Sequence, residues 1–201
     1  MFGSVTTPMR PRLTSSQLIS AWIAITLAAS IVAAVDGGWL ASWTALAPAR
    51  IWRGEVWRLA TWVFVERGPM ALVFTCAAIY KLGGDLAPRW GDRRLKRFMI
   101  EIVIGAGVVT SLLALVASDA WHLQRAGGFA VADVLVIAWA RQYPSQPLTL
   151  YGLLTLRGRE LVAVTLGVTL LVALYAGPFA VAPELVACAA AAAYPKVRLR
   201  T

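Results

Sequence analysis

Charged residues are scarce in this chain. Asp, Glu, Lys and Arg make up 14% of its 201 residues, whereas a soluble globular domain usually contains about 25%. Hydrophobic residues make up 59%, and the mean hydropathy is +0.69. This composition excludes an ordinary soluble globule and predicts a protein whose surface faces lipid.

Cysteine and histidine are scarcer still. The chain has two cysteines, Cys76 and Cys188, both within apolar runs, and one histidine, His122. Two isolated thiols exclude a disulfide framework, and we expect both to be buried and inert. Because His122 has no second ligand at a useful spacing, we predict no metal or haem site and expect no cofactor.

Long charge-free runs are the main positive feature. Three of them have 18, 17 and 23 residues: Leu18–Val35, Ile102–Ser118 and Leu161–Pro183. Each is near the roughly 20 residues that cross a hydrocarbon core. Three weaker candidates are Gly68–Tyr80, Phe129–Ala140 with Asp133 inside it, and Leu185–Pro195 after Glu184. Because a bundle interior tolerates short or polar segments, we predict an all-α membrane protein with six transmembrane helices.

The predicted helices form one domain, residues 18–195, between two short tails. Residues 1–17 form a polar N-terminal tail, and residues 196–201 form a basic C-terminal tail. The first run, Leu18–Val35, lacks a convincing small-residue cleavage site before Asp36. We therefore expect it to be a retained membrane anchor rather than a signal peptide.

The net charge of +9 raises the question of a nucleic-acid partner. With six spans and a cytoplasmic N-terminus, 14 of the 19 basic residues fall in inner segments and 5 in outer ones. This asymmetry follows the positive-inside rule. The basic residues therefore indicate topology, with both termini in the cytoplasm, and we expect a lipid bilayer rather than a nucleic acid as partner.

The longest connection between spans, Asp36–Pro69, is rich in tryptophan and arginine. It holds five of the nine tryptophans and four arginines: Trp39, Trp43, Trp52, Trp57, Trp62, Arg50, Arg53, Arg58 and Arg67. Trp prefers the headgroup region of a bilayer, and Arg reaches phosphates and ring faces. We therefore expect an outer loop in the membrane interface, which either seals the bundle or forms a recognition surface.

Four segments of the chain contain short motifs that occur together in one protein family. The first, Leu46–Phe64, contains a Gly-Glu-x-Trp-Arg element formed by Gly54, Glu55, Trp57 and Arg58. The others are Leu82–Gly91, Ala138–Pro144 and Leu150–Leu153. Together these segments resemble the rhomboid intramembrane proteases and their Derlin relatives, from about residue 46 to about residue 155. The resemblance implies a rhomboid-like bundle of six helices.

The nucleophile and histidine of that family are missing from the matching positions. Active rhomboids carry a serine in a Gly-x-Ser-Gly turn on the fourth span and a histidine on the sixth. Alignment on Tyr143 places Phe129 at the serine and Ala130 at the following glycine. Phenylalanine cannot attack a carbonyl group, so the resemblance implies a catalytically inactive member without catalytic residues.

Other family positions have changed as well. Ala71 and Thr75 stand where the second span of active members has His and Asn near the oxyanion. On the sixth span, the pattern His-x-x-Gly-x-x-x-Gly is matched weakly by Glu184, Ala187 and Ala191. The alanine pair keeps the small-x-x-x-small spacing that allows close helix packing.

Asp133 lies in a predicted membrane helix, four residues after Phe129. That spacing places both on one helix face. A carboxyl group at membrane depth needs a partner, and Thr75 and Tyr80 are the candidates from the second span. Asp133 is either a structural group or part of a polar binding cavity with Phe129, Thr75 and Glu184. Glu184 also fits an acidic residue in the first turn of its helix.

These features lead to two functional hypotheses. In the first, the chain is a rhomboid-like pseudoprotease that binds transmembrane segments of client or partner proteins, for quality control, sorting or assembly, without cleaving them. In the second, it is a fixed accessory subunit of a larger membrane protein complex. A third interpretation, proton conduction through Asp133 and Glu184, has less support.

Overall fold

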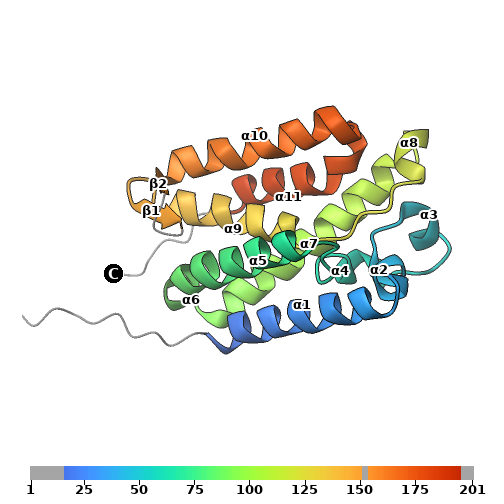
Figure 1. Ribbon diagram of the computed structural model, residues 1–201. Coiled ribbons are helices and arrows are strands. Elements are labelled where there is room, and N and C mark those ends of the chain that lie inside the picture. Colours follow the sequence, from blue (N-terminus) through green and yellow to red (C-terminus); the bar gives the residue numbers. More distant parts are fainter. Residues whose placement is uncertain (1–15, 151–153, 196–201) are drawn as a thin grey trace, which may run out of the picture.

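The computed structural model describes residues 16–150 and 154–195. The chain is mainly helical (Figure 1), with these helices: α1 (Gln17–Val35), α2 (Trp39–Thr44), α3 (Pro48–Ile51), α4 (Arg58–Thr61), α5 (Pro69–Ala78), α6 (Gly84–Trp90), α7 (Asp92–Leu113), α8 (Ser118–Trp121), α9 (Phe129–Gln142), α10 (Gly158–Ala176) and α11 (Ala182–Ala193). Nearly all of the N-terminal tail, the C-terminal tail and the motif residues 151–153 lie outside the described residues.

Within the described residues, three helical segments are long and apolar enough to cross a membrane. They are α1, the continuous segment Pro69–Trp90 and α10. The match between α1 and the predicted span is close. The prediction for the second span was too short, because α5 continues through a π-helical turn, Ile79–Gly83, into α6. Lys81 and Asp85 ended the charge-free run, but they form an i,i+4 ion pair of 3.2 Å within this helix.

Helix α7 is displaced from the predicted span Ile102–Ser118. It begins ten residues earlier, at Asp92, and ends at Leu113. Its first half is amphipathic, since Leu95, Phe98 and Met99 are buried while the four basic residues between Asp92 and Phe98 are exposed. Charge-free runs do not reveal the first half of this helix, because basic residues interrupt it. Its apolar residues recur at helical spacing instead.

The predicted span Leu161–Pro183 is wrong at its C-terminal end. Helix α10 ends at Ala176, and Gly177 follows with a φ of 90°, a conformation that favours glycine. A 3₁₀ turn, Pro178–Val181, then reverses the chain into α11. The apolar run therefore contains a helix, a turn and the first residues of the next helix.

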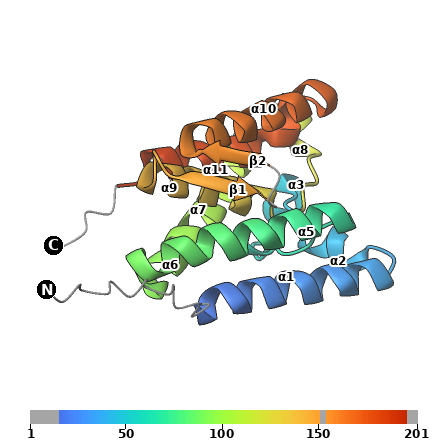
Figure 2. The same cartoon turned by 60° about the vertical axis from the view of Figure 1, so that its left-hand side comes forward.

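Helix α9 lies in the middle of the bundle. Ten of its 14 residues are buried, and it packs against α5, α7, α10 and α11. Two views show α1 beside α5 and α6 on one side of α9, and α10 and α11 on the other (Figures 1 and 2). Being surrounded by helices explains how this short segment with an internal carboxyl group is accommodated.

The segment between α1 and α5 is ordered and contributes to the core. It contains the short helices α2, α3 and α4, of which α3 and α4 pack against α7. Leu46 forms an antiparallel bridge with Arg125, through backbone hydrogen bonds of 2.7 and 3.0 Å. Trp62 and Val63 are fully buried. This segment is therefore more than a surface loop.

A short hairpin departs from the all-α prediction. Strands β1 (Pro147–Leu150) and β2 (Leu154–Arg157) pair in antiparallel fashion, with Leu148 opposite Leu156. The hairpin connects α9 to α10 and lies at the left-hand end of the bundle in Figure 1. A two-stranded ribbon satisfies part of its backbone internally, which suits a connection at the membrane boundary.

Candidate binding cavity

A cavity of about 760 Å³ lies between α5 and α10, with α9 as its floor. Most of its lining side chains are apolar. They are Phe74, Thr75, Ala77, Ala78, Tyr80, Lys81, Leu82, Arg125, Phe129, Ala132, Asp133, Val136, Leu148, Leu161, Val164, Thr165, Val168, Thr169, Val172, Val181 and Glu184. Pockets that bind ligands commonly combine an apolar wall with a few polar groups in this way.

The structure brings together the four residues that the sequence analysis assigned to a cavity. Thr75, Phe129, Asp133 and Glu184 all line it, although they come from α5, α9 and α11. Phe129 lies at the first position of α9 and is 41% exposed. The alanine pair lies elsewhere: Ala187 and Ala191 are buried on α11, which packs against α7 and α9.

The neighbours of Asp133 differ from those expected. Thr169 of α10 and Glu184 of α11 lie near its carboxyl group, and all three residues line the cavity. Thr75 instead donates a hydrogen bond of 2.6 Å to Glu66. Thr75 is therefore not the partner of Asp133, because Glu66 engages its hydroxyl group.

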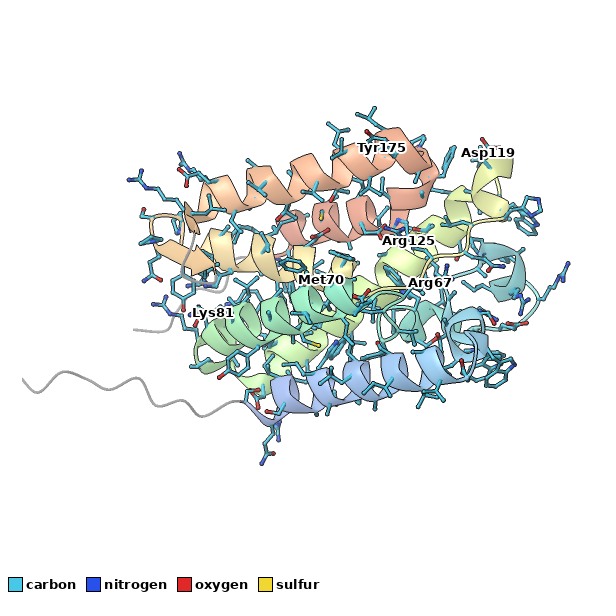
Figure 3. The ribbon with its side chains drawn as sticks, viewed as in Figure 1. Arg67, Met70, Lys81, Asp119, Arg125 and Tyr175 are labelled. Carbon is cyan, nitrogen blue, oxygen red and sulfur yellow. The ribbon has the colours of Figure 1, made fainter. Side chains whose placement is uncertain are left out.

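Glu184 lies in the first turn of α11, as expected, but its main partner is a cation. Arg125 donates a hydrogen bond of 2.7 Å from Nε to Glu184 Oε1. The glutamate is only 4% exposed, and its second oxygen, Oε2, has no hydrogen-bond partner among the described residues. Figure 3 shows Arg125 near the junction of α7, α9 and α11.

Glu66 is a buried acidic residue that the sequence analysis missed. Its Oε1 accepts hydrogen bonds from Thr75 Oγ1 at 2.6 Å and from the backbone amide of Gly128 at 2.7 Å. Its own backbone amide donates to Ser30 Oγ of α1 at 3.0 Å. A carboxylate at a helix N-terminus is favourable because the free amides and the helix dipole point toward it.

The glycines before α9 permit this contact. A Cβ on Gly128 would lie 2.5 Å from Thr75 Cγ2 and 3.1 Å from the carbonyl oxygen of Val63. Gly127 has a φ of 140° and would place a Cβ 3.1 Å from Glu66 Oε2. The Gly127-Gly128 pair was thus a signal of close approach, but it did not identify Glu66 as the neighbour.

The Gly-Glu-x-Trp-Arg element holds the α2–α4 segment together. Arg58 is fully buried, and its Nη1 donates to the carbonyl oxygens of Ser42 and Ala45 at 2.7 and 2.8 Å. Its Nε donates to Glu55 at 2.6 Å. Gly54 supplies a turn with a φ of 102° before Glu55. A single guanidinium group therefore joins three parts of the segment.

The tryptophans of this segment divide into two groups. Trp39, Trp43 and Trp57 stack in series, with ring centroids 6.1 and 5.0 Å apart, and remain exposed. Trp62 is fully buried in the core. Trp52 donates from Nε1 to the carbonyl oxygen of Ser111 on α7 at 3.0 Å. Trp52 is nevertheless 49% exposed, so every tryptophan of this segment except Trp62 keeps the exposed aromatic face expected of an interfacial surface.

Two of the motif segments meet at the opposite end of α9. Asp85 Oδ2 accepts a hydrogen bond of 3.1 Å from Trp139 Nε1, and the Asp85 carbonyl oxygen accepts one of 3.1 Å from the Tyr143 hydroxyl. The Arg89 guanidinium lies 4.5 Å from the centre of the Tyr143 ring. The segments Leu82–Gly91 and Ala138–Pro144 therefore form one structural unit.

Within the described residues, no group of three or more His, Cys, Asp or Glu side chains could hold a metal ion. His122 is exposed at the end of α8, away from the cavity lining. The side chains around the cavity can form hydrogen bonds and ion pairs, through Asp133, Glu184 and Arg125.

Comparisons with known proteins identify the family. The sequence matches a family described as eukaryotic integral membrane protein (DUF1751) over residues 14–195. It is also 26% identical over 114 residues to Derlin-1 of Oryza sativa subsp. japonica. The matched residues make up 56% of this chain and 46% of that protein. The chain thus spans about half the length of this curated relative. The chain belongs to this family of integral membrane proteins and is a member of the Derlin and rhomboid-like superfamily.

Proposed function

We propose that the chain is a pseudoprotease that binds transmembrane segments of other proteins in the cavity between α5 and α10, without cleaving them. The observation that carries this proposal is the position of the cavity. Both flanking helices belong to segments that can cross a membrane. A large, mainly apolar cavity between two such helices suits an apolar helix from a neighbouring protein.

The walls of the cavity support this interpretation. Val164, Val168 and Val172 are spaced four residues apart and form one face of α10, opposite Phe74 and Ala78 of α5. Apolar side chains at this spacing, facing small and aromatic residues, are typical of a groove that accepts a helix. Quality control, sorting and assembly are roles that such binding would serve, as the resemblance to Derlins suggests.

The proposal includes a topology of six crossings within one domain, residues 18–195, and cytoplasmic termini. The crossings are α1, the segment Pro69–Trp90, α7, α9, α10 and α11. With 14 residues, α9 is about 21 Å long, which is less than the roughly 30 Å of a hydrocarbon core. Its burial within the bundle supports a short crossing, and the family match over residues 14–195 supports a single domain.

Lack of catalysis is part of the proposal. Phe129 stands at the nucleophile position that the resemblance assigns. Nearby, the Thr75 hydroxyl and the Gly128 amide are both engaged by Glu66. These are donors that could otherwise stabilise a developing oxyanion. The bound segment is therefore expected to remain intact.

The test uses the purified chain in lipid nanodiscs and a fluorescent single-span peptide of 20 Leu and Ala residues. We expect saturable binding, and mass spectrometry should recover the peptide uncleaved. Replacing Val164 and Val168 by Trp fills the cavity wall and should weaken binding at least tenfold. Cleavage of the peptide, or equal binding by the wild type and this double variant, would contradict the proposal.

A matched control is available on the same helix. Leu170 and Leu174 have the same four-residue spacing and are 62% and 77% exposed, but they do not line the cavity. Leu170→Trp with Leu174→Trp should leave binding within about twofold of the wild type. A chain that purifies only in a fixed ratio with one other membrane protein, and binds no added peptide, would favour the accessory-subunit hypothesis instead.

A further inference from the structure

The polar end of the cavity contains more acidic than basic groups. Asp133 projects from α9 and Glu184 from α11, and both line the cavity. One cation, Arg125, lies beside them and is bonded to Glu184 Oε1 at 2.7 Å. One guanidinium therefore faces two carboxyl groups, and it makes its hydrogen bond to only one of them.

The other cation of the lining lies elsewhere. Lys81 comes from the π-helical turn and is paired with Asp85 at 3.2 Å. Figure 3 shows Lys81 and Arg125 toward opposite ends of the molecule. Of the polar groups on α10, the Thr169 hydroxyl donates to the carbonyl oxygen of Thr165 at 3.1 Å, although it lies near Asp133. Asp133 therefore has a nearby hydroxyl group but no cation of its own in the described lining.

An unused oxygen provides a second, independent observation. Glu184 is 96% buried, since it is 4% exposed, and its Oε2 has no partner among the described residues. A buried carboxylate oxygen without a donor is unfavourable and is normally satisfied by a ligand, a water or an ion. Glu184 and Asp133 both line the cavity, so this oxygen lies at the same polar end as the Asp133 carboxyl group.

We propose that the cavity selects transmembrane segments that carry a Lys or Arg near their middle, whose cation binds between Asp133 and Glu184. This inference rests on the proposed function and adds the class of segment. Such a residue is costly to expose to lipid, and it gains a counter-charge in the cavity. An all-apolar segment would leave Asp133 without a counter-charge and Glu184 Oε2 without a hydrogen-bond donor.

The depth of Asp133 fits a basic residue near the middle of the segment. Asp133 is four residues after the start of α9, which is about 6 Å along the helix axis. The midpoint of this 14-residue helix is about 10 Å from its start. Asp133 therefore lies within about one turn of the middle of the most central helix.

The experiment compares peptides that differ at one position. The complete chain in nanodiscs is titrated with 20-residue Leu and Ala peptides whose central residue is Leu, Gln, Lys or Asp. We expect the Lys peptide to bind at least tenfold more tightly than the Leu peptide, the Gln peptide to resemble the Leu peptide, and the Asp peptide to bind most weakly. This comparison uses the wild-type chain, so it does not depend on the folding of a variant.

Two variants then locate the effect. Asp133→Asn should reduce the preference for Lys over Leu to threefold or less. Asp92→Asn removes an acidic residue at the start of α7, outside the cavity lining, and should retain the preference. An unchanged preference in Asp133→Asn would overturn the assignment of Asp133.

The remaining outcomes separate this inference from the proposed function. Equal binding of the Leu and Lys peptides would overturn the inference and leave the proposed function intact. Equal binding of the Gln and Lys peptides would show that hydrogen bonding alone selects the segment, which also overturns it. Binding of none of the peptides would overturn both.

Discussion

On one side of α9, Glu66 is enclosed between α1, α5 and the start of α9, while on the other side Asp133 and Glu184 line the cavity beside α10. The enclosed carboxylate accepts hydrogen bonds from Thr75 and Gly128, at 2.6 and 2.7 Å. On the cavity side, Glu184 retains an oxygen without a partner among the described residues. The carboxylate on one side of α9 is thus hydrogen-bonded within the protein, whereas the acidic groups on the other side can accept further hydrogen bonds.

The difference shows how stability and binding can be divided within one bundle. A fully bonded network of buried polar groups rigidifies the elements that it joins. Groups with unused bonding capacity cost stability but are available to a ligand. We therefore expect substitutions on the Glu66 side to lower stability, and substitutions on the cavity side to change binding with little effect on stability.

The largest loss of stability is expected for Glu66→Ala. This change leaves the Gly128 amide and the Thr75 hydroxyl buried without their acceptor, at a cost of about 3 kcal/mol in the free energy of unfolding. Unfolding of the purified protein in detergent, followed by circular dichroism, measures the loss. Glu66→Gln keeps an acceptor oxygen and should lose less. If Glu66→Ala unfolds like the wild type, the enclosed network does not stabilise the fold.

A somewhat smaller loss is expected for Arg58→Ala. It removes the donor to Ser42 and Ala45 and leaves those carbonyl oxygens unpaired, which should cost about 2 kcal/mol. Limited proteolysis should then cut between Asp36 and Arg67 earlier than in the wild type. Arg53→Ala, at an exposed position of the same segment, is the control and should change neither measurement.

The smallest effect is expected for Asp133→Asn. The amide has nearly the same shape and still accepts a hydrogen bond, so the free energy of unfolding should change by less than about 0.5 kcal/mol. A parallel denaturation series with Glu66→Ala measures this. A loss as large as that of Glu66→Ala would place Asp133 among the structural groups and end the contrast between the two sides.

Much of the helical pattern could be predicted from single segments. Helix α1 and the start of α9 were placed closely, because each is an apolar run with clear boundaries. The errors arose where the ends of a charge-free run are not the ends of a helix. Lys81 and Asp85 pair within a continuing helix, and Gly177 breaks an apolar run that contains no charge.

The residues of the cavity were predicted only in part. Phe129 and Asp133 follow from helical spacing within one segment, and Thr75 and Glu184 from the family pattern. Arg125 and Thr169 were missed as neighbours of the acidic groups, because they come from other segments and belong to no motif. Glu66 was missed for the same reason, since its partners Thr75 and Gly128 are 9 and 62 residues away.

The sequence by itself determined a helical membrane protein of the rhomboid-like superfamily, because apolar runs and short motifs are local properties of the chain. Only the tertiary structure decided which acidic groups are enclosed and which line a cavity. Burial and hydrogen bonding depend on the segments that pack against each carboxyl group. Glu66, Asp133 and Glu184 are chemically alike in the sequence, and they differ only in the helices that surround them.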